Sequence, residues 1–284
     1  MSIENIFSEL WLAAFWGPLA VGLILFLLSK FFSGKNEEKI VTFKYVREVV
    51  VKHVVEVKER KRASRPVSQT RRSGARNGRD DPAPALIGIG LLFLSFFYAK
   101  HQTEVVAVVL GFSTFILSFV LFTVFFGISK NIAHDHSWTR YLYTTLFLAL
   151  LGYPLMYIAL NPIYAPLEVN NMSSIVMDGG LASMFKNFGL KGVGFLMFQA
   201  LGFLTLAIAM LLQTLSLVFY TSVIQLAVSP NQRPIINFVA QITSKFRSPN
   251  KMIAFSIVLY VFSFVLISGV GYEWWYSAAN NHVN

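Results

Sequence analysis

The stretch VVAVVLGFSTFILSFVLFTVFFGIS, residues 105–129, contains no Asp, Glu, Lys or Arg. A charged side chain at the centre of a bilayer costs about 2.5 to 3.5 kcal/mol on insertion scales. A helix of about 20 apolar residues is long enough to cross about 30 Å of hydrocarbon. Residues 105–129 therefore predict a membrane-spanning helix.

The rest of the chain repeats this pattern. Of its 284 residues, 55% are hydrophobic and only 13% are charged, a composition far from that of a soluble domain. Five further tracts lack charged residues: Leu10 to Ser29, Pro82 to Ala99, Tyr141 to Leu167, Gly192 to Gln232 and Met252 to Tyr272. The sequence predicts an all-α polytopic membrane protein with about six transmembrane helices.

The tract from Gly192 to Gln232 is long enough for a helix of about 60 Å, roughly twice the hydrocarbon thickness. We expect one helix that begins near Gly192 and leaves the bilayer around Tyr220. The alternative is a break into two spans, which would move the C-terminus to the other side of the membrane.

The orientation follows from the basic residues, because short loops rich in Lys and Arg stay on the cytoplasmic side. With six spans, 21 of the 24 Lys and Arg residues fall on one side, and Lys100, Lys186 and Lys191 fall on the other. The sequence therefore predicts a protein of the plasma (inner) membrane with its N-terminus and C-terminus outside. Its parts are residues 1–32 with the first span, a basic cytoplasmic segment at 33–81, and a transmembrane region at 82–284.

The first part of the basic segment, residues 39–62, reads KIVTFKYVREVVVKHVVEVKERKR. Its charges recur every four residues, which fits either a helix with i,i+4 pairs or a strand with all charges on one face. The many β-branched valines favour the strand. Because no turn interrupts it, such a strand needs a partner from another copy of the chain. We therefore predict an oligomerisation element, with Val49, Val51, Val55 and Val57 on the pairing face.

The second part, residues 63–81, reads ASRPVSQTRRSGARNGRDD and has no apolar periodicity. Such a segment is expected to be a disordered linker, because it cannot bury enough surface to offset its ordering entropy. Its bases suit anionic lipid headgroups or an acidic protein partner. The predicted contact residues of the basic segment are Arg60, Arg62, Arg71 and Arg72. A nucleic-acid partner is disfavoured, since the bases are not spread over a folded surface that faces water.

The loop between the last two uncharged tracts contains a short apolar pattern. Ser-Pro-Asn occurs at residues 229–231 and again at 248–250, which predicts a short helix between the two motifs. Its apolar residues Ile235, Val239, Ile242 and Phe246 share one face. Two interpretations are open, an interfacial helix in the membrane surface or a helix that packs on its own bundle.

Few residues suggest catalysis. The chain has no cysteine, and its strongest metal-binding pattern is His134-Asp135-His136, which lacks a third imidazole at a suitable spacing. We predict no cofactor, no metal site and no enzymatic activity.

The spans contain polar but uncharged side chains. Gln199 and Gln213 are fourteen residues apart, so they fall on nearly the same helical face. They predict either hydrogen bonds between helices or the lining of a pore. Three functions follow: a non-enzymatic membrane subunit that anchors or assembles a larger complex with other membrane or cytoplasmic proteins, a homo-oligomeric channel, and a membrane enzyme that depends on metal or modifies lipid. We rank them in that order.

Overall fold

The computed structural model describes residues 83–129, 136–166, 172–228 and 234–281. Within these ranges the chain forms helices, and no strand occurs in them. The predicted first span and the basic segment at 33–81, including the valine-rich part, lie outside the described residues. Their predicted structure is therefore not tested.

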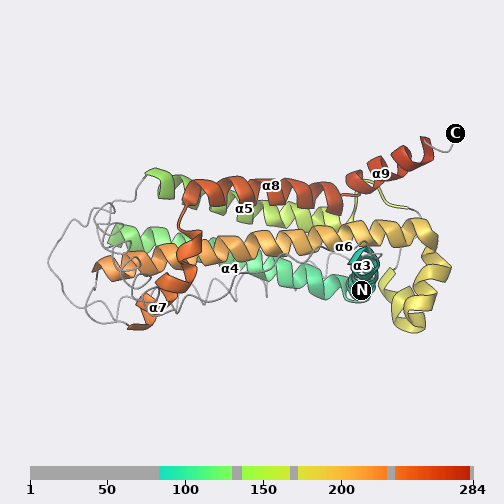
Figure 1. The fold of residues 1–284 in the computed structure, drawn as a ribbon, viewed down its shortest axis with the longest axis horizontal. Helices are drawn as coiled ribbons and strands as arrows, with labels where there is room; N and C mark the ends of the chain where they lie inside the picture. Colours follow the sequence, from blue (N-terminus) through green and yellow to red (C-terminus); the bar gives the residue numbers. More distant parts are fainter. Residues whose placement is uncertain (1–82, 130–135, 167–171, 229–233, 282–284) are drawn as a thin grey trace, which may run out of the picture.

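Four helices run side by side and form the body of the molecule (Figure 1). They are α4 (Gln102–Ser129), α5 (His136–Leu160), α6 (Met172–Val228) and α8 (Pro249–Ile267). Each contains an apolar window long enough to cross a membrane. Four of the six predicted spans thus correspond to helices that are long and apolar enough to cross a membrane, which is consistent with an integral membrane protein.

Helix α6 is broken near its start and continuous afterwards. Gly180 and Gly189 have φ values of 66° and 59°, and residues other than glycine rarely adopt this backbone conformation. From Gly189 to Val228 the helix has no further interruption, which corresponds to a length of about 58 Å. The predicted single helix is confirmed, and the alternative of two separate spans within this tract is wrong.

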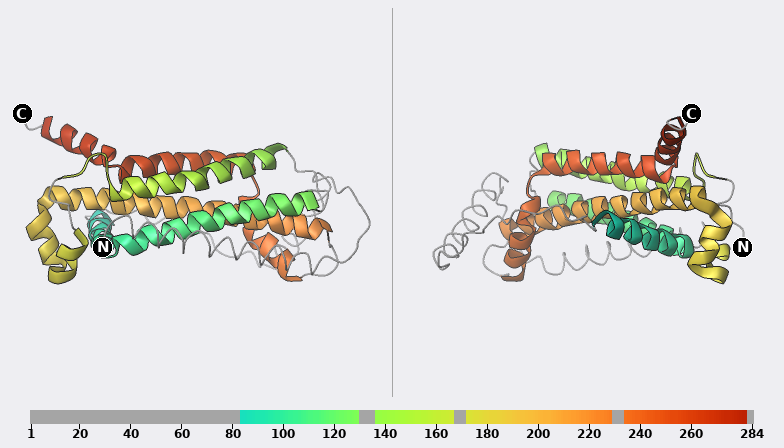
Figure 2. Two further views of the ribbon diagram at one scale, coloured as in Figure 1. Left: turned by 180° about the vertical axis from the view of Figure 1, so that it is seen from behind. Right: turned by 45° about the vertical axis from the view of Figure 1, so that its right-hand side comes forward.

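Helix α3 (Ala83–Lys100) has a different orientation from the four spans. It is seen end-on in Figure 1, where α4, α5, α6 and α8 run across the view, and its length appears only after rotation (Figure 2, right). Its C-terminal part packs on α6, where the Tyr98 and Phe203 rings lie 4.9 Å apart. The second uncharged tract is thus helical and apolar, but it lies across the bundle and is shorter than the spans.

Two predicted tracts end earlier than their lack of charge indicated. Helix α5 stops at Leu160 and does not continue to Leu167, because Asn161 and Pro162 follow and a residue before proline disfavours the helical conformation. Helix α8 stops at Ile267, and the chain turns at Gly269 with φ 83° before α9 (Val270–Asn281) begins. Helix α9 then leaves the bundle at an angle (Figure 1).

The loop between α6 and α8 forms the predicted short helix, α7 (Pro234–Thr243), followed by a 3-10 turn at Ser244–Phe246. The second Ser-Pro-Asn motif marks the start of α8 at Pro249, as predicted, because proline is well suited to the first turn of a helix.

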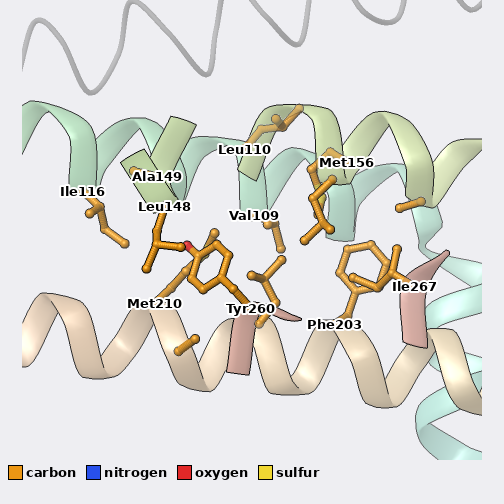
Figure 3. Packing of buried hydrophobic residues seen from close by; sticks show 14 of the residues in the cluster. Val109, Leu110, Ile116, Leu148, Ala149, Met156, Phe203, Met210, Tyr260 and Ile267 are labelled. Carbon is orange, nitrogen blue, oxygen red and sulfur yellow. The ribbon is translucent and has the colours of Figure 1, made fainter. Parts of the chain in front are cut away.

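The interior of the bundle is filled with large apolar side chains from all four spans. Figure 3 shows Ile116, Met210, Phe203 and Tyr260 among the residues that lie between α6 and the ribbons of α4 and α5. Equally large side chains point outward, including Val108, Phe147 and Val258, which are 71%, 59% and 63% exposed. An outward apolar surface on every span is what a lipid environment requires.

The two ends of the bundle differ in charge. In the described ranges, the end that carries α7 has four cations and no acidic residue: Arg140, Lys245, Arg247 and Lys251. The end that carries α9 has three cations and three acids: Lys100, Lys186, Lys191, Glu104, Asp178 and Glu273. We refer to these below as the basic end and the neutral end.

Candidate functional site

Uncharged polar side chains gather where the four spans face one another. We call this set the polar seam, and its buried members are Ser113, Thr114, Thr123, Tyr141, Gln199, Gln213, Ser216, Thr221, Tyr260 and Ser263. Side chains of this kind usually bond across helices in a membrane, since lipid offers them no partner. The seam is therefore the place to look for either structural bonds or a polar path.

Gln199 joins three helices at the neutral end. Its Nε2 donates to the carbonyl oxygens of Ala159, at 3.4 Å, and Ile267, at 3.3 Å. These residues end α5 and α8, and the last four carbonyls of any helix have no partner within it. The Nε2 of one buried amide thus satisfies the free carbonyls of two helix ends, while its Oε1 makes no hydrogen bond. The two bonds of Nε2 fit the structural interpretation of Gln199.

Other seam residues also bond across the bundle. Ser263 Oγ of α8 donates to the Gly202 carbonyl of α6 at 2.8 Å, and the Thr114 and Tyr153 hydroxyls link α4 to α5 at 2.7 Å. Both hydrogen bonds are short. The glycine at position 202 allows α6 and α8 to pack closely, because a Cβ there would lie only 2.7 Å from the Ile267 Cγ1. These bonds fix the spans at close distance.

Gln213 differs from Gln199, although both are fully buried. Its backbone carbonyl accepts a hydrogen bond from the Tyr141 hydroxyl at 3.0 Å. Its side-chain amide faces the Tyr260 hydroxyl of α8, but neither the amide nor that hydroxyl makes a hydrogen bond of normal geometry. Two polar groups with unused bonding capacity thus lie together inside the bundle, and Tyr260 was not predicted as a member of the site.

Ser113 is a further seam member with unused bonding capacity. Its buried hydroxyl has no hydrogen bond, and it lies against the backbone of Gly152 with Met210 close by. Any side chain at position 152 would displace it. The glycine therefore lets α4 and α5 approach each other. This contact lies beside Met210, which is one turn of α6 before Gln213.

The other predicted site residues are placed as follows. Val49, Val51, Val55, Val57, Arg60, Arg62, Arg71 and Arg72 lie outside the described residues, as do His134 and Asp135. His136 begins α5, and its Nε2 is 3.2 Å from the Arg140 guanidinium. Among the described residues, no three His, Asp or Glu side chains are close enough to hold a metal ion.

The contrast between the two glutamines gives a testable prediction. Gln199→Leu should lower the free energy of unfolding by about 1 to 3 kcal/mol, because it leaves two buried carbonyls without a donor. Gln213→Leu should leave stability nearly unchanged or raise it, because it removes amide atoms that have no partner. Thermal unfolding of the two purified variants in detergent measures the difference, and equal losses would contradict this interpretation.

Comparisons with known proteins give no relative. No family model matches the chain, and no curated protein or solved structure is significantly similar to it.

Proposed function

We propose that the chain is a non-enzymatic integral membrane subunit that anchors or assembles a larger complex. The observation that carries the proposal is the use of the polar seam. The Gln199 Nε2, the Ser263 Oγ and the Thr114 hydroxyl form hydrogen bonds to neighbouring helices, and among the described residues no buried side chain is charged. A coupled transporter or pump usually places an ionisable residue there.

The proposed orientation places the basic end of the bundle in the cytoplasm and α9 outside. Among the described residues, one end has four cations and no acidic residue, while the other has equal numbers of cations and acids, and this asymmetry supports the arrangement. It fits the plasma (inner) membrane with both termini outside, provided that residues 1–100 cross the membrane twice.

In this proposal the basic segment at 33–81 makes the contacts with partners. Residues 39–62 pair between copies through Val49, Val51, Val55 and Val57. Arg60, Arg62, Arg71 and Arg72 contact anionic headgroups or an acidic surface of another membrane or cytoplasmic protein. The bundle then serves as the anchor that holds this segment at the membrane surface.

The test is affinity purification of the tagged protein from native membranes in mild detergent. The full chain should retain partners in fixed stoichiometry and should sediment as an oligomer. Deletion of residues 39–62 should abolish both the retention of partners and the oligomer. A chain in which residues 63–81 are replaced by a Gly/Ser linker of equal length is the control for simple shortening. A monomeric full chain without stoichiometric partners contradicts the proposal.

A second candidate, a homo-oligomeric channel, is favoured by Gln213 and Tyr260, whose polar groups face each other inside the bundle. Their buried polar atoms have no partner, as expected for groups that bind a passing polar solute. The Gln213→Leu variant described above also decides this question. A conductance in planar bilayers that changes in this variant supports the channel.

A further inference from the structure

Helix α7 carries a row of exposed apolar side chains. Ile235, Phe238 and Ile242 are 75%, 62% and 58% exposed. Their spacing of three and four residues places them on one face of the helix. An exposed apolar row on a short surface helix needs an apolar environment, and the chain as described provides none for it.

The remaining surface of α7 is divided between the bundle and water. Ala240 and Thr243 are buried against the bundle, while Asn237 and Gln241 are exposed on a third side. By helical geometry these three sectors are well separated. The apolar row therefore cannot turn inward without exposing Ala240 and Thr243, and it lies between the bundle contact and the polar side.

Helix α7 lies at a defined level along the bundle. The chain just after it is fixed to α6 by the hydrogen bond from Ser216 Oγ to the Phe246 carbonyl, at 3.2 Å. Helix α8 then runs 19 residues to Ile267, a length of about 28 Å, close to the hydrocarbon thickness. Since α8 crosses the membrane from this level, α7 lies where the hydrocarbon meets the headgroups.

The charges around α7 are of one sign. Lys245 and Arg247 follow it directly, Lys251 lies in the first turn of α8, and Arg140 lies near the start of α5 at the same end of the bundle. A cation in the first turn opposes the helix dipole unless an anion is close. The described residues offer no carboxylate at this end.

From these observations we infer that α7 lies in the membrane surface at the basic end, with Ile235, Phe238 and Ile242 in the acyl boundary and Lys245, Arg247 and Lys251 on anionic lipid headgroups. The three sectors of α7 match the three environments at that level: bundle, lipid and water. Helices with this division of surface bind more strongly as the anionic lipid content rises. This inference does not depend on the proposed function, because it involves only described residues outside the basic segment.

The position of the apolar row is tested with the full chain, which has no cysteine and accepts single labels. Phe238→Cys and Asn237→Cys carry the fluorophore NBD in vesicles of phosphatidylcholine and phosphatidylglycerol. Lipid brominated near the headgroup should quench NBD at 238, and aqueous iodide should quench it at 237. Equal iodide quenching at both positions overturns the inference. The inference is also overturned if NBD fluorescence at 238 changes with the protein-to-lipid ratio and not with the bromolipid content, since a second copy of the chain would then cover the apolar row.

The charge contacts are tested by lipid retention in native mass spectrometry. Arg247→Glu and Lys245→Glu should each lower the retention of phosphatidylglycerol relative to phosphatidylcholine by about fivefold or more, the factor that about 1 kcal/mol per cation represents. Lys186→Glu, the same change on an exposed residue at the neutral end, is the matched control. An equal loss in the control overturns the inference.

Discussion

Replacing Gly269 by alanine is expected to lower the midpoint of thermal unfolding by about 10 °C, the largest stability loss expected from any single methyl group in the described bundle. Gly269 has φ 83°, and a Cβ there would overlap the carbonyl group of Tyr164. A non-glycine residue in this conformation costs about 1 to 3 kcal/mol, and the overlap adds to it. A loss of about 3 kcal/mol or more corresponds to that temperature shift for a chain of this size.

The reason for this sensitivity is the tight junction around Gly269. The amides of Ile163 and Tyr164 both donate to the Ser268 carbonyl, at 3.0 and 3.2 Å, so the loop after α5 is tied to the end of α8. Gln199 joins the same two helix ends from α6. A displaced Tyr164 would therefore disturb three spans together.

Two glycine variants are the controls for this prediction. Gly111→Ala lies in a helix with no atom within 4 Å of the new methyl group, and it should be neutral or slightly stabilising. Gly189→Ala has the same sign of φ but open space around it, so it isolates the backbone term. Detergent-solubilised Gly269→Ala that unfolds at the temperature of Gly111→Ala would contradict the prediction.

Labelling of single cysteines from one side of the membrane should give an all-or-none result. In intact cells, a membrane-impermeant maleimide should label Ser277→Cys in α9, because that end of the bundle is proposed to lie outside. It should label Asn250→Cys, at the start of α8, and Ser73→Cys, in the basic segment, only after permeabilisation. Since the chain has no cysteine of its own, the background is low.

Ser73→Cys is also the decisive test of α3. The strongly basic segment at 33–81 is expected in the cytoplasm, which requires the chain to cross the membrane between residues 81 and 102. The orientation of α3 across the spans gives no such crossing (Figure 1). If α3 stays on the outer side, 18 of the 24 basic residues share the side of α9, and residue 73 is labelled together with residue 277. That result would reverse the proposed placement of the basic segment.

The spans themselves could be predicted from the sequence because hydrocarbon rejects charge along a continuous stretch. The end of α4 at Ser129 and the start of α8 at Pro249 were predicted to within a few residues, each marked by a cation or a proline nearby. The early ends of α5 and α8 were missed, since Asn161-Pro162 and Ser268-Gly269 carry no charge. These two helix ends are marked by turn residues, and a search for uncharged tracts does not take turn residues into account.

The orientation of α3 and the difference between the two glutamines could not be predicted in this way. Both depend on which parts of distant helices meet. Gln199 has partners only because α5 and α8 end beside it, and Gln213 lacks them because Tyr260 lies just out of bonding geometry. Periodicity indicated that both glutamines share a face, but it contains no information about where neighbouring helices stop.

The short length of α8 has a consequence for the surrounding lipid. Its 19 residues connect the end of the bundle that carries α7 to the end that carries α9, and neither neighbour continues its direction. At about 28 Å the helix only just matches the hydrocarbon thickness, so it has no spare length for tilting, and in a thicker bilayer the acyl chains next to it must compress. The long α6 imposes no such limit on the lipid beside it. In thicker bilayers the leaflets around this protein should therefore thin first along α8, and short-chain lipids should enrich on that flank.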